Sequence, residues 1–183
     1  MHPDSKHRAG DVASVTDIDG ARRRRSVEGS DSSFSHEIER LYRVDGNRLW
    51  RAVYAYSGSR VVADDATAEA FAQLIRRGRA VENARAWVWR SAFRIAGGLL
   101  KDRHRTVNEL VIDLSYEEPP DVIDLVRLLQ ELSSAQRASI VLHDYAGYRA
   151  REAAEIIGST EAAVRVHLMR GRRKLRERLD SAD

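Results

Sequence analysis

The 183-residue chain has no cysteine, which excludes disulfide bonds, thiolate catalysis and cysteine-based zinc sites. No uninterrupted apolar stretch approaches the roughly 20 residues that a membrane-spanning helix needs. The first twenty residues lack the apolar segment of a secretory signal. We therefore expect a cytoplasmic protein with no membrane insertion.

Positive charge is missing from one segment and concentrated in others. Residues 109–124 carry several acidic side chains but no lysine or arginine, whereas basic residues cluster at 22–25, 76–105 and 165–178. The net charge of +3 conceals this asymmetry. Such a distribution indicates surfaces that bind a polyanion, joined by an acidic connector.

An alternating strand pattern is also absent, and apolar residues recur instead at helical spacing. The sequence predicts an all-α fold: two small helical domains joined by an acidic linker, the C-terminal one a helix-turn-helix. Helices are expected over residues 35–57, from Asp64 or Asp65 through Ile75, from 84 to 105, and over 122–132, 135–145, 150–157 and 160–179. The domain plan is a disordered tail (1–33), a helical domain (34–105), a linker (106–121), a second helical domain (122–179) and a short tail (180–183).

The last helix divides into two arcs of different chemistry. Its inner arc, at helical spacing, is Val164, Leu168, Gly171 and Leu175. Its outer arc is Ala162, Val166, Met169 and Arg173, flanked by Arg165 and Arg170. Apolar side chains that point outward among arginines are typical of a helix in the DNA major groove, where they pack on thymine methyl groups.

The preceding helix supports this interpretation. Ala153 and Ala154 are small enough for a close helix crossing, and Gly158 suits the left-handed backbone of a tight turn. Helix, glycine-containing turn and basic helix together predict a helix-turn-helix. The alternative is an ordinary helical hairpin whose arginines are simply solvated.

Two stretches resemble a known family. "LLQELSSAQRASIVLHDYAGYRAREAAEIIGSTEAAVRVHLMRGRRKLRERL" resembles region four of the extracytoplasmic-function (ECF) sigma factors of the sigma-70 superfamily, which reads the minus-thirty-five promoter element. "LYRVDGNRLWRAVYAYSGSRVVADDATAEAFAQLIRRGRAVENARAWVWRSAFRIAGGLLKDRHR" resembles region two, which binds RNA polymerase and opens the minus-ten element. The resemblance implies core RNA polymerase and promoter DNA as partners.

The resemblance implies roles at the upstream element. Base contacts would come from Arg165, Val166 and Met169, the outer arc that helical spacing gives independently. Phosphate contacts, which position without reading sequence, would come from Thr160, Arg170, Arg172 and Arg173.

In region two, the resemblance implies that Asp64, Asp65 and Glu69 bind the polymerase, although an exposed, solubilising helix face explains them as well. The loop of residues 76–83 matches a pocket for a flipped base, and the next helix would line the DNA path. The implied downstream contacts are Arg76, Arg77, Arg79, Asn83, Arg85, Trp87, Arg90, Arg94, Lys101, Arg103 and Arg105. Aromatic residues at this spacing are often core, and we expect Trp87 or Trp89 to be buried. Asn83 is a candidate cap for that helix.

No set of residues composes a catalytic site. His143 and Asp144 are adjacent but have no nucleophile beside them. The acids of the second helix lack a further ligand for magnesium. We therefore expect no enzyme activity, no metal and no cofactor.

Two alternatives remain open at this point. One is a dimeric helix-turn-helix transcriptional regulator that binds a palindrome without being a polymerase subunit. The other is a helical adaptor that binds protein only. The sigma-factor interpretation instead implies a monomer when free, which an anti-sigma factor holds inactive.

Overall fold

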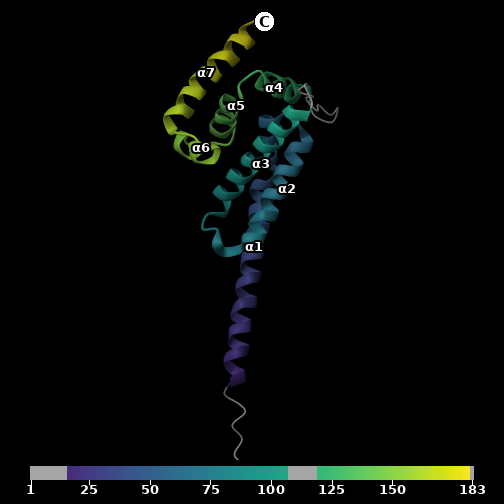
Figure 1. The fold of residues 1–183 in the computed structure, drawn as a ribbon, viewed down its shortest axis with the longest axis vertical. Helices are drawn as coiled ribbons and strands as arrows, with labels where there is room; N and C mark the ends of the chain where they lie inside the picture. Colours follow the sequence, from purple (N-terminus) through teal and green to yellow (C-terminus); the bar gives the residue numbers. More distant parts are fainter. Residues whose placement is uncertain (1–15, 107–118, 182–183) are drawn as a thin grey trace, which may run out of the picture. The chain divides into compact units, whose positions relative to one another are not determined.

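The computed structural model describes residues 16–106 and 119–181, with side chains over 33–102 and 119–181 (Figure 1). Every regular element within these residues is helical, which confirms the all-α prediction. The elements are α1 (Thr16–Ser57), α2 (Arg60–Arg77), η1 (Gly78–Ala80), α3 (Ala84–Thr106), α4 (Pro120–Gln130), α5 (Ser134–Ile140), η2 (Val141–Tyr145), α6 (Ala150–Ile157) and α7 (Glu161–Asp180). The chain divides into two compact units, residues 1–37 and residues 38–183. The candidate site described below lies in the second unit.

Helix α1 begins earlier than the sequence pattern predicts. Its first residue is Thr16, whereas a disordered tail was expected to residue 33 and a helix only from Ser35. Extending an existing helix costs less than nucleating one, and the arginines at 22–25 are good helix formers, so polar residues can join the helix without an apolar stripe. Residues 1–15 of the expected tail lie outside the described residues.

The residues of α1 in the second unit, together with α2 and α3, form the first helical layer, whose core combines large side chains such as Leu49, Leu74 and Trp89 with several alanines. Ala63, Ala66 and Ala70 on α2 are fully buried, and their small side chains let neighbouring helices approach closely. Helix α2 begins at Arg60 because the Ser59 hydroxyl accepts a hydrogen bond from the Val62 N–H. The expected start at Asp64 or Asp65 is therefore one turn too late.

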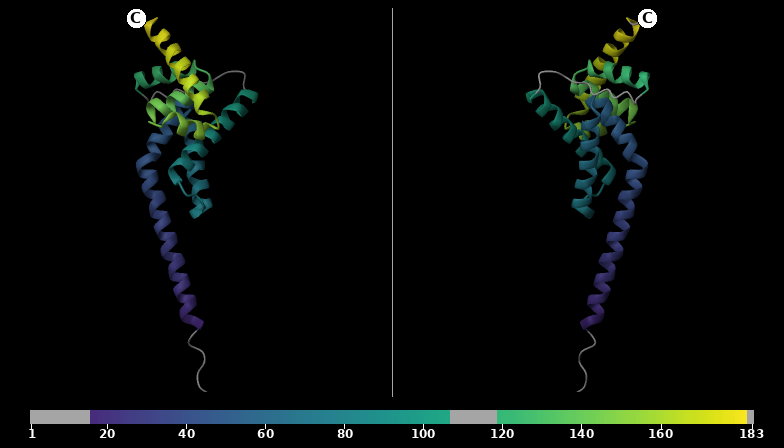
Figure 2. Two further views of the ribbon diagram at one scale, coloured as in Figure 1. Left: turned by 90° about the vertical axis from the view of Figure 1, so that its left-hand side faces the viewer. Right: turned by 90° about the vertical axis from the view of Figure 1, so that its right-hand side faces the viewer.

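Helices α4 to α7 form the second layer, in which α7 packs on α5 and α6 (Figures 1 and 2). Val164 of α7 and Leu142 of η2 are fully buried in its core. The predicted single helix over 135–145 is instead α5 followed by the wider π turn η2, which closes with a 2.9 Å bond from the Ala146 N–H to the Val141 carbonyl. Residues 107–118, most of the expected linker, lie outside the described residues.

Several specific contacts join the two layers within the second unit. The Trp89 and Tyr148 rings meet edge to face with centroids 5.1 Å apart. Arg48 donates to the Ala146 carbonyl at 2.8 Å. The guanidinium of Arg137, which is 6% exposed, lies 5.6 Å from the centre of the Tyr56 ring. Burial lowers the pKa of Arg137.

The turn between α6 and α7 depends on one glycine. Gly158 ends α6 with φ 68° and ψ 45°, the left-handed conformation that the sequence predicted. A Cβ atom at this position would have no heavy atom within 4 Å, so backbone strain is the only cost of a side chain.

We predict that Gly158→Ala lowers the free energy of unfolding by about 1 kcal/mol, because alanine is strained in the left-handed region. Gly158→Asn should cost less, because asparagine tolerates this conformation. Urea denaturation followed by circular dichroism measures both. Equal losses for the two variants would contradict the backbone explanation.

Candidate nucleic-acid interface

Helix α7 is held in place by its cap and by its inner arc. The Thr160 side chain caps the helix by accepting a hydrogen bond from the Ala163 N–H at 3.2 Å. Val164 is 0% and Leu168 5% exposed, and Gly171 is also buried. A Cβ atom on Gly171 would lie 2.7 Å from Cδ1 of Ile140, so glycine permits the close crossing with α5. The predicted inner arc is thus confirmed at these three positions.

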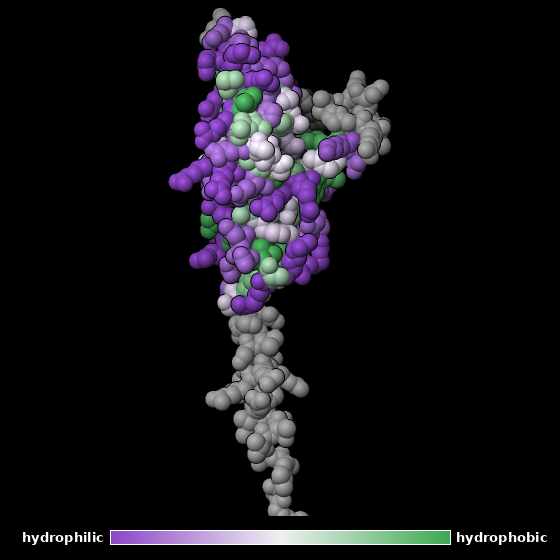
Figure 3. Space-filling view, turned by 60° about the vertical axis from the view of Figure 1, so that its left-hand side comes forward, coloured by the Kyte–Doolittle hydropathy of each residue, from purple (hydrophilic) through white to green (hydrophobic). Residues whose placement is uncertain are grey.

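The outer arc of α7 faces away from the protein. Met169 is 62% and Val166 40% exposed, although both are apolar. Arg165 and Arg170 are exposed beside them. The visible face of the molecule is otherwise largely hydrophilic, with small apolar patches between polar side chains (Figure 3). The predicted outward orientation is confirmed, while contact with DNA stays a prediction.

A basic hollow of about 1060 Å³ lies between α7, η2 and the start of α6. Arginines from both helices line it, together with Met169 and a single carboxylate, Glu161. These arginines are Arg149, Arg151, Arg165, Arg172, Arg173 and Arg176. Positive charge gathered on one concave face attracts a polyanion. The arginines on the α6 side were not singled out from the sequence, because their role depends on the turn that brings α6 beside α7.

Carboxylates orient three of the predicted contact residues. Arg172 pairs with Asp144 of η2 through two nitrogen atoms, the closer approach being 2.5 Å. This hydrogen bond raises the pKa of Arg172. Arg165 pairs with Glu161 at 2.6 Å.

The third pair, Arg173 with Glu177, is looser at 3.6 Å. Sequence reasoning missed all three carboxylates. Spacing of four residues on one helix signals Glu161 and Glu177, whereas Asp144 lies 28 residues from its partner and has no local signal.

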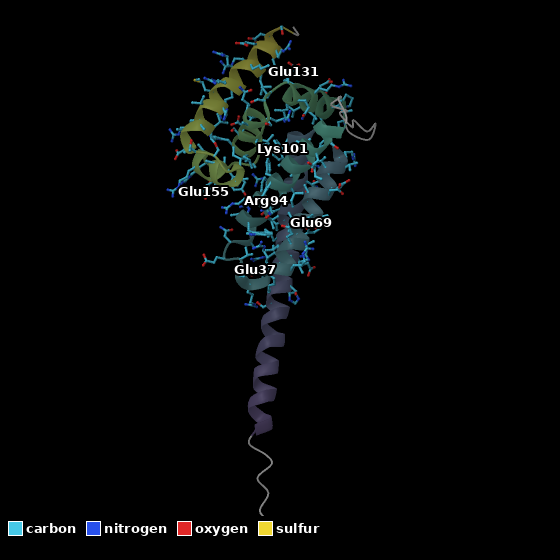
Figure 4. All side chains as sticks on the ribbon, in the orientation of Figure 1. Glu37, Glu69, Arg94, Lys101, Glu131 and Glu155 are labelled. Carbon is cyan, nitrogen blue, oxygen red and sulfur yellow. The ribbon has the colours of Figure 1, made fainter. Side chains whose placement is uncertain are left out.

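The acids of α2 occupy an exposed helix face. Asp65 is exposed, and Asp64 accepts a hydrogen bond from the Trp50 indole at 2.6 Å. Glu69, labelled in Figure 4, accepts hydrogen bonds from Gln73 and Arg76, and these lower its pKa. The face therefore presents negative charge, partly engaged by its own neighbours.

The start of α3 uses two of the predicted downstream residues for folding. The Asn83 carboxamide oxygen accepts a hydrogen bond from the Ala86 N–H at 3.0 Å, which confirms the expected cap. Arg85 forms a 2.6 Å ion pair with Asp45, whose side chain is only 7% exposed. Both residues are thus engaged within the protein.

The tryptophans near this end of α3 differ in burial. Trp89 is 1% exposed, as expected for one of the two. Trp87 is half-buried beneath the Arg77 guanidinium, 5.5 Å from its ring centre. Arg79 is exposed on η1.

Farther along α3, basic side chains border a groove of about 870 Å³ shared with α5 and α6. Arg90, Arg94 and Lys101 line it, and Glu155 of α6 is its only lining carboxylate among the described residues. Figure 4 labels Arg94 and Lys101 on α3 and Glu155 on α6. The side chains of Arg103 and Arg105 lie outside the described set. The predicted downstream residues whose side chains are described therefore divide among the end of α2 with η1, the start of α3 and this groove.

No group of three or more histidine or acidic side chains among the described residues could hold a metal ion. No helix in residues 16–106 or 119–181 is long and apolar enough to cross a membrane.

Part of the second layer matches the model of a known family. Residues 123–175 match the model of the family described as Sigma-70, region 4. This match confirms the resemblance for the C-terminal domain. No curated protein sequence matches the chain.

Solved structures share the fold over a larger part of the chain. CnrH in complex with the cytosolic domain of CnrY is 20% identical and superposes with a TM-score of 0.67, covering 85% of this chain and 96% of that one. The sigma factor RpoE from Bartonella quintana, in complex with the anti-sigma factor NepR, is 20% identical with a TM-score of 0.68, covering 79% and 97%. At this identity the likeness establishes the fold alone.

The Asp45–Arg85 pair generates a prediction that separates folding from DNA contact. Arg85→Ala leaves the buried Asp45 carboxylate without this partner, and we expect the free energy of unfolding to fall by about 2 kcal/mol. Adding Asp45→Asn removes the buried charge and should restore part of the loss. Urea unfolding of the single and double variants measures this. Unchanged stability of Arg85→Ala would mean that the arginine has no structural role.

Proposed function

We propose that this chain, whose residues 123–175 form a sigma-70 region 4 domain, is an ECF-type sigma factor that binds core RNA polymerase and directs promoter-specific initiation of transcription. The observation that carries the proposal is the division of α7 into a buried arc and an exposed arc of arginines and apolar side chains. A helix built in this way can enter the major groove without unfolding any part of its domain.

At the upstream element, Arg165, Val166 and Met169 read bases, while Thr160, Arg170, Arg172 and Arg173 contact phosphates. Exposure of the first group supports the reading role, because base edges are reached only by side chains that project from the helix. Arg172 and Arg173 line the basic hollow together with Arg165, which supports their proposed contact with phosphates.

At the other layer, the exposed acids Asp64, Asp65 and Glu69 bind a basic surface of the polymerase. The basic residues of the α2–α3 loop and of α3, together with Trp87, contact the DNA of the downstream element. Arg85 and Asn83 act there chiefly by shaping the start of α3, since both are engaged within the protein.

We propose the corresponding domain plan: residues 34–105 for polymerase and the minus-ten element, 106–121 as the acidic linker, and 122–179 for the minus-thirty-five element. The chain is a cytoplasmic monomer when free and has no enzymatic activity of its own, because the polymerase performs the chemistry. A likeness to sigma-factor RpoE held by an anti-sigma factor supports an anti-sigma partner for this chain as well.

The decisive experiment mixes the full chain with core RNA polymerase and assays run-off transcription from a library of promoter fragments. We expect defined start sites that are absent with core polymerase alone. A chain that fails to bind core polymerase at moderate salt overturns the proposal. A homodimer that binds a palindrome without polymerase would establish the dimeric regulator in its place.

Arginine substitutions test the division of labour on α7. We expect Arg165→Ala to cost about 1–3 kcal/mol of binding free energy on promoters that carry the base pair which Arg165 contacts. Arg172→Ala should weaken binding to all promoter sequences by a similar factor. Binding of the polymerase complex to wild-type and single-base variant promoters measures both. Equal losses for Arg165→Ala on cognate and scrambled promoters would remove it from the reading role.

A further inference from the structure

In the ion pair at the start of α7, one carboxylate oxygen accepts hydrogen bonds from two nitrogens of the same arginine. Two nitrogens of Arg165, Nε and Nη2, donate to the same oxygen, Oε1 of Glu161, at 3.1 and 2.6 Å. The arginine side chain remains 71% exposed and the glutamate 41%. The pair thus stands at the surface, beside the exposed Val166, and both of its side chains line the basic hollow.

This contact selects which edge of the guanidinium remains available. A guanidinium has five N–H donors in a fixed planar fork. Glu161 occupies the side edge, which Nε and Nη2 form. The end edge, formed by Nη1 and the second proton of Nη2, keeps two parallel donors. Two parallel donors match the O6 and N7 acceptors of guanine.

A second arginine–glutamate pair on the same helix shows what an ordinary surface pair looks like. Arg173 and Glu177 are also four residues apart, but their single contact is 3.6 Å, and the arginine precedes the glutamate. Exposed pairs of this kind contribute little to stability. Glu161 precedes its arginine, which is the better order on a helix, and holds two donors.

The Glu161 carboxylate also disfavours contact between Arg165 and groups other than a base edge. A phosphate that approached the arginine would meet the negative charge of Glu161 within the same hollow. The neutral edge of guanine, whose O6 and N7 carry only partial negative charge, is repelled less than a phosphate. Glu161 therefore weakens sequence-independent contact while it leaves the guanine contact open, and both effects increase discrimination.

Resting on the proposed function, we propose that Glu161 is a positioning residue that sets the base preference of Arg165. It fixes the guanidinium with its end edge outward and disfavours a phosphate in its place. Promoter selectivity at one base pair of the upstream element is thereby shared between the two residues.

The test uses the full chain bound to core polymerase on a promoter recovered from the run-off library. Binding is compared between this promoter and variants at the base pair that Arg165→Ala identifies. Glu161→Ala is the test variant and Glu177→Ala its matched control, because both remove one carboxylate from an arginine four residues away on α7. We expect Glu161→Ala to lower the ratio of cognate to variant binding about tenfold, the range of one bidentate base contact.

The control variant should raise binding to scrambled DNA, as Glu161→Ala does, and leave the ratio unchanged. Glu161→Gln keeps an acceptor oxygen without the charge, so it should retain more of the ratio than alanine. It also keeps the test valid should the alanine variant fold poorly, which circular dichroism reports.

The possible results distinguish the positioning role of Glu161 from the sigma-factor proposal on which it rests. Wild-type discrimination that survives in Glu161→Ala and Glu161→Gln overturns the positioning role and leaves the sigma-factor proposal standing. An equal loss of the ratio in Glu177→Ala overturns it as well, because charge alone would then be the cause. A wild-type chain that selects no promoter overturns both.

Discussion

The close crossing of α7 over α5 is the constraint on which the rest of the interface depends. Gly171 permits it, because any side chain there would meet Ile140 of α5. Val164 and Leu168 complete the buried arc, and the exposed arc follows from the helical period. The orientation of the exposed arc is therefore determined by packing on the opposite side of the same helix, not by the exposed residues themselves.

Carboxylates fix the orientation of several arginine side chains on the basic surface of α7. Glu161 and Asp144 each hold an arginine of α7 through two nitrogen atoms. Asp45 does the same for Arg85 in the first layer, where its buried charge makes the pair part of the fold. A field of flexible arginines would bind any polyanion, whereas held ones present a defined set of donors. A defined set of donors on this surface thus depends on the acidic residues as much as on the arginines.

Local signals in the sequence were sufficient for the helix-turn-helix. Helix α6 has the predicted limits, Ala150–Ile157, because its apolar spacing, its glycine and the threonine cap of α7 all agree. The sequence also places Val166 and Met169 outward, since period alone decides the face of a helix. These inferences need no knowledge of distant residues.

Other features had no local signal. The first turns of α1, from Thr16, have no apolar stripe in the sequence. No helix-propensity rule predicts the π turn η2 after α5. The pairing of Asp144 with Arg172 arises only when η2 and α7 come together. For Arg85, the family resemblance implied a DNA contact, but the fold pairs this arginine with a buried acid. Tertiary partners decide the role of a charged residue, and periodicity does not report them.

The internal ion pairs of α7 bear on how its binding responds to ionic strength. Counterion release makes affinity fall with salt in proportion to the phosphates neutralised by cations that were previously solvated. Arg172 and Arg173, the proposed phosphate contacts, already have carboxylate neighbours. When such an arginine exchanges its carboxylate for a phosphate, the freed carboxylate takes up cations, so the net release of ions is smaller than the number of arginines suggests. The affinity of this surface should therefore decline less steeply with added salt than its arginine content implies.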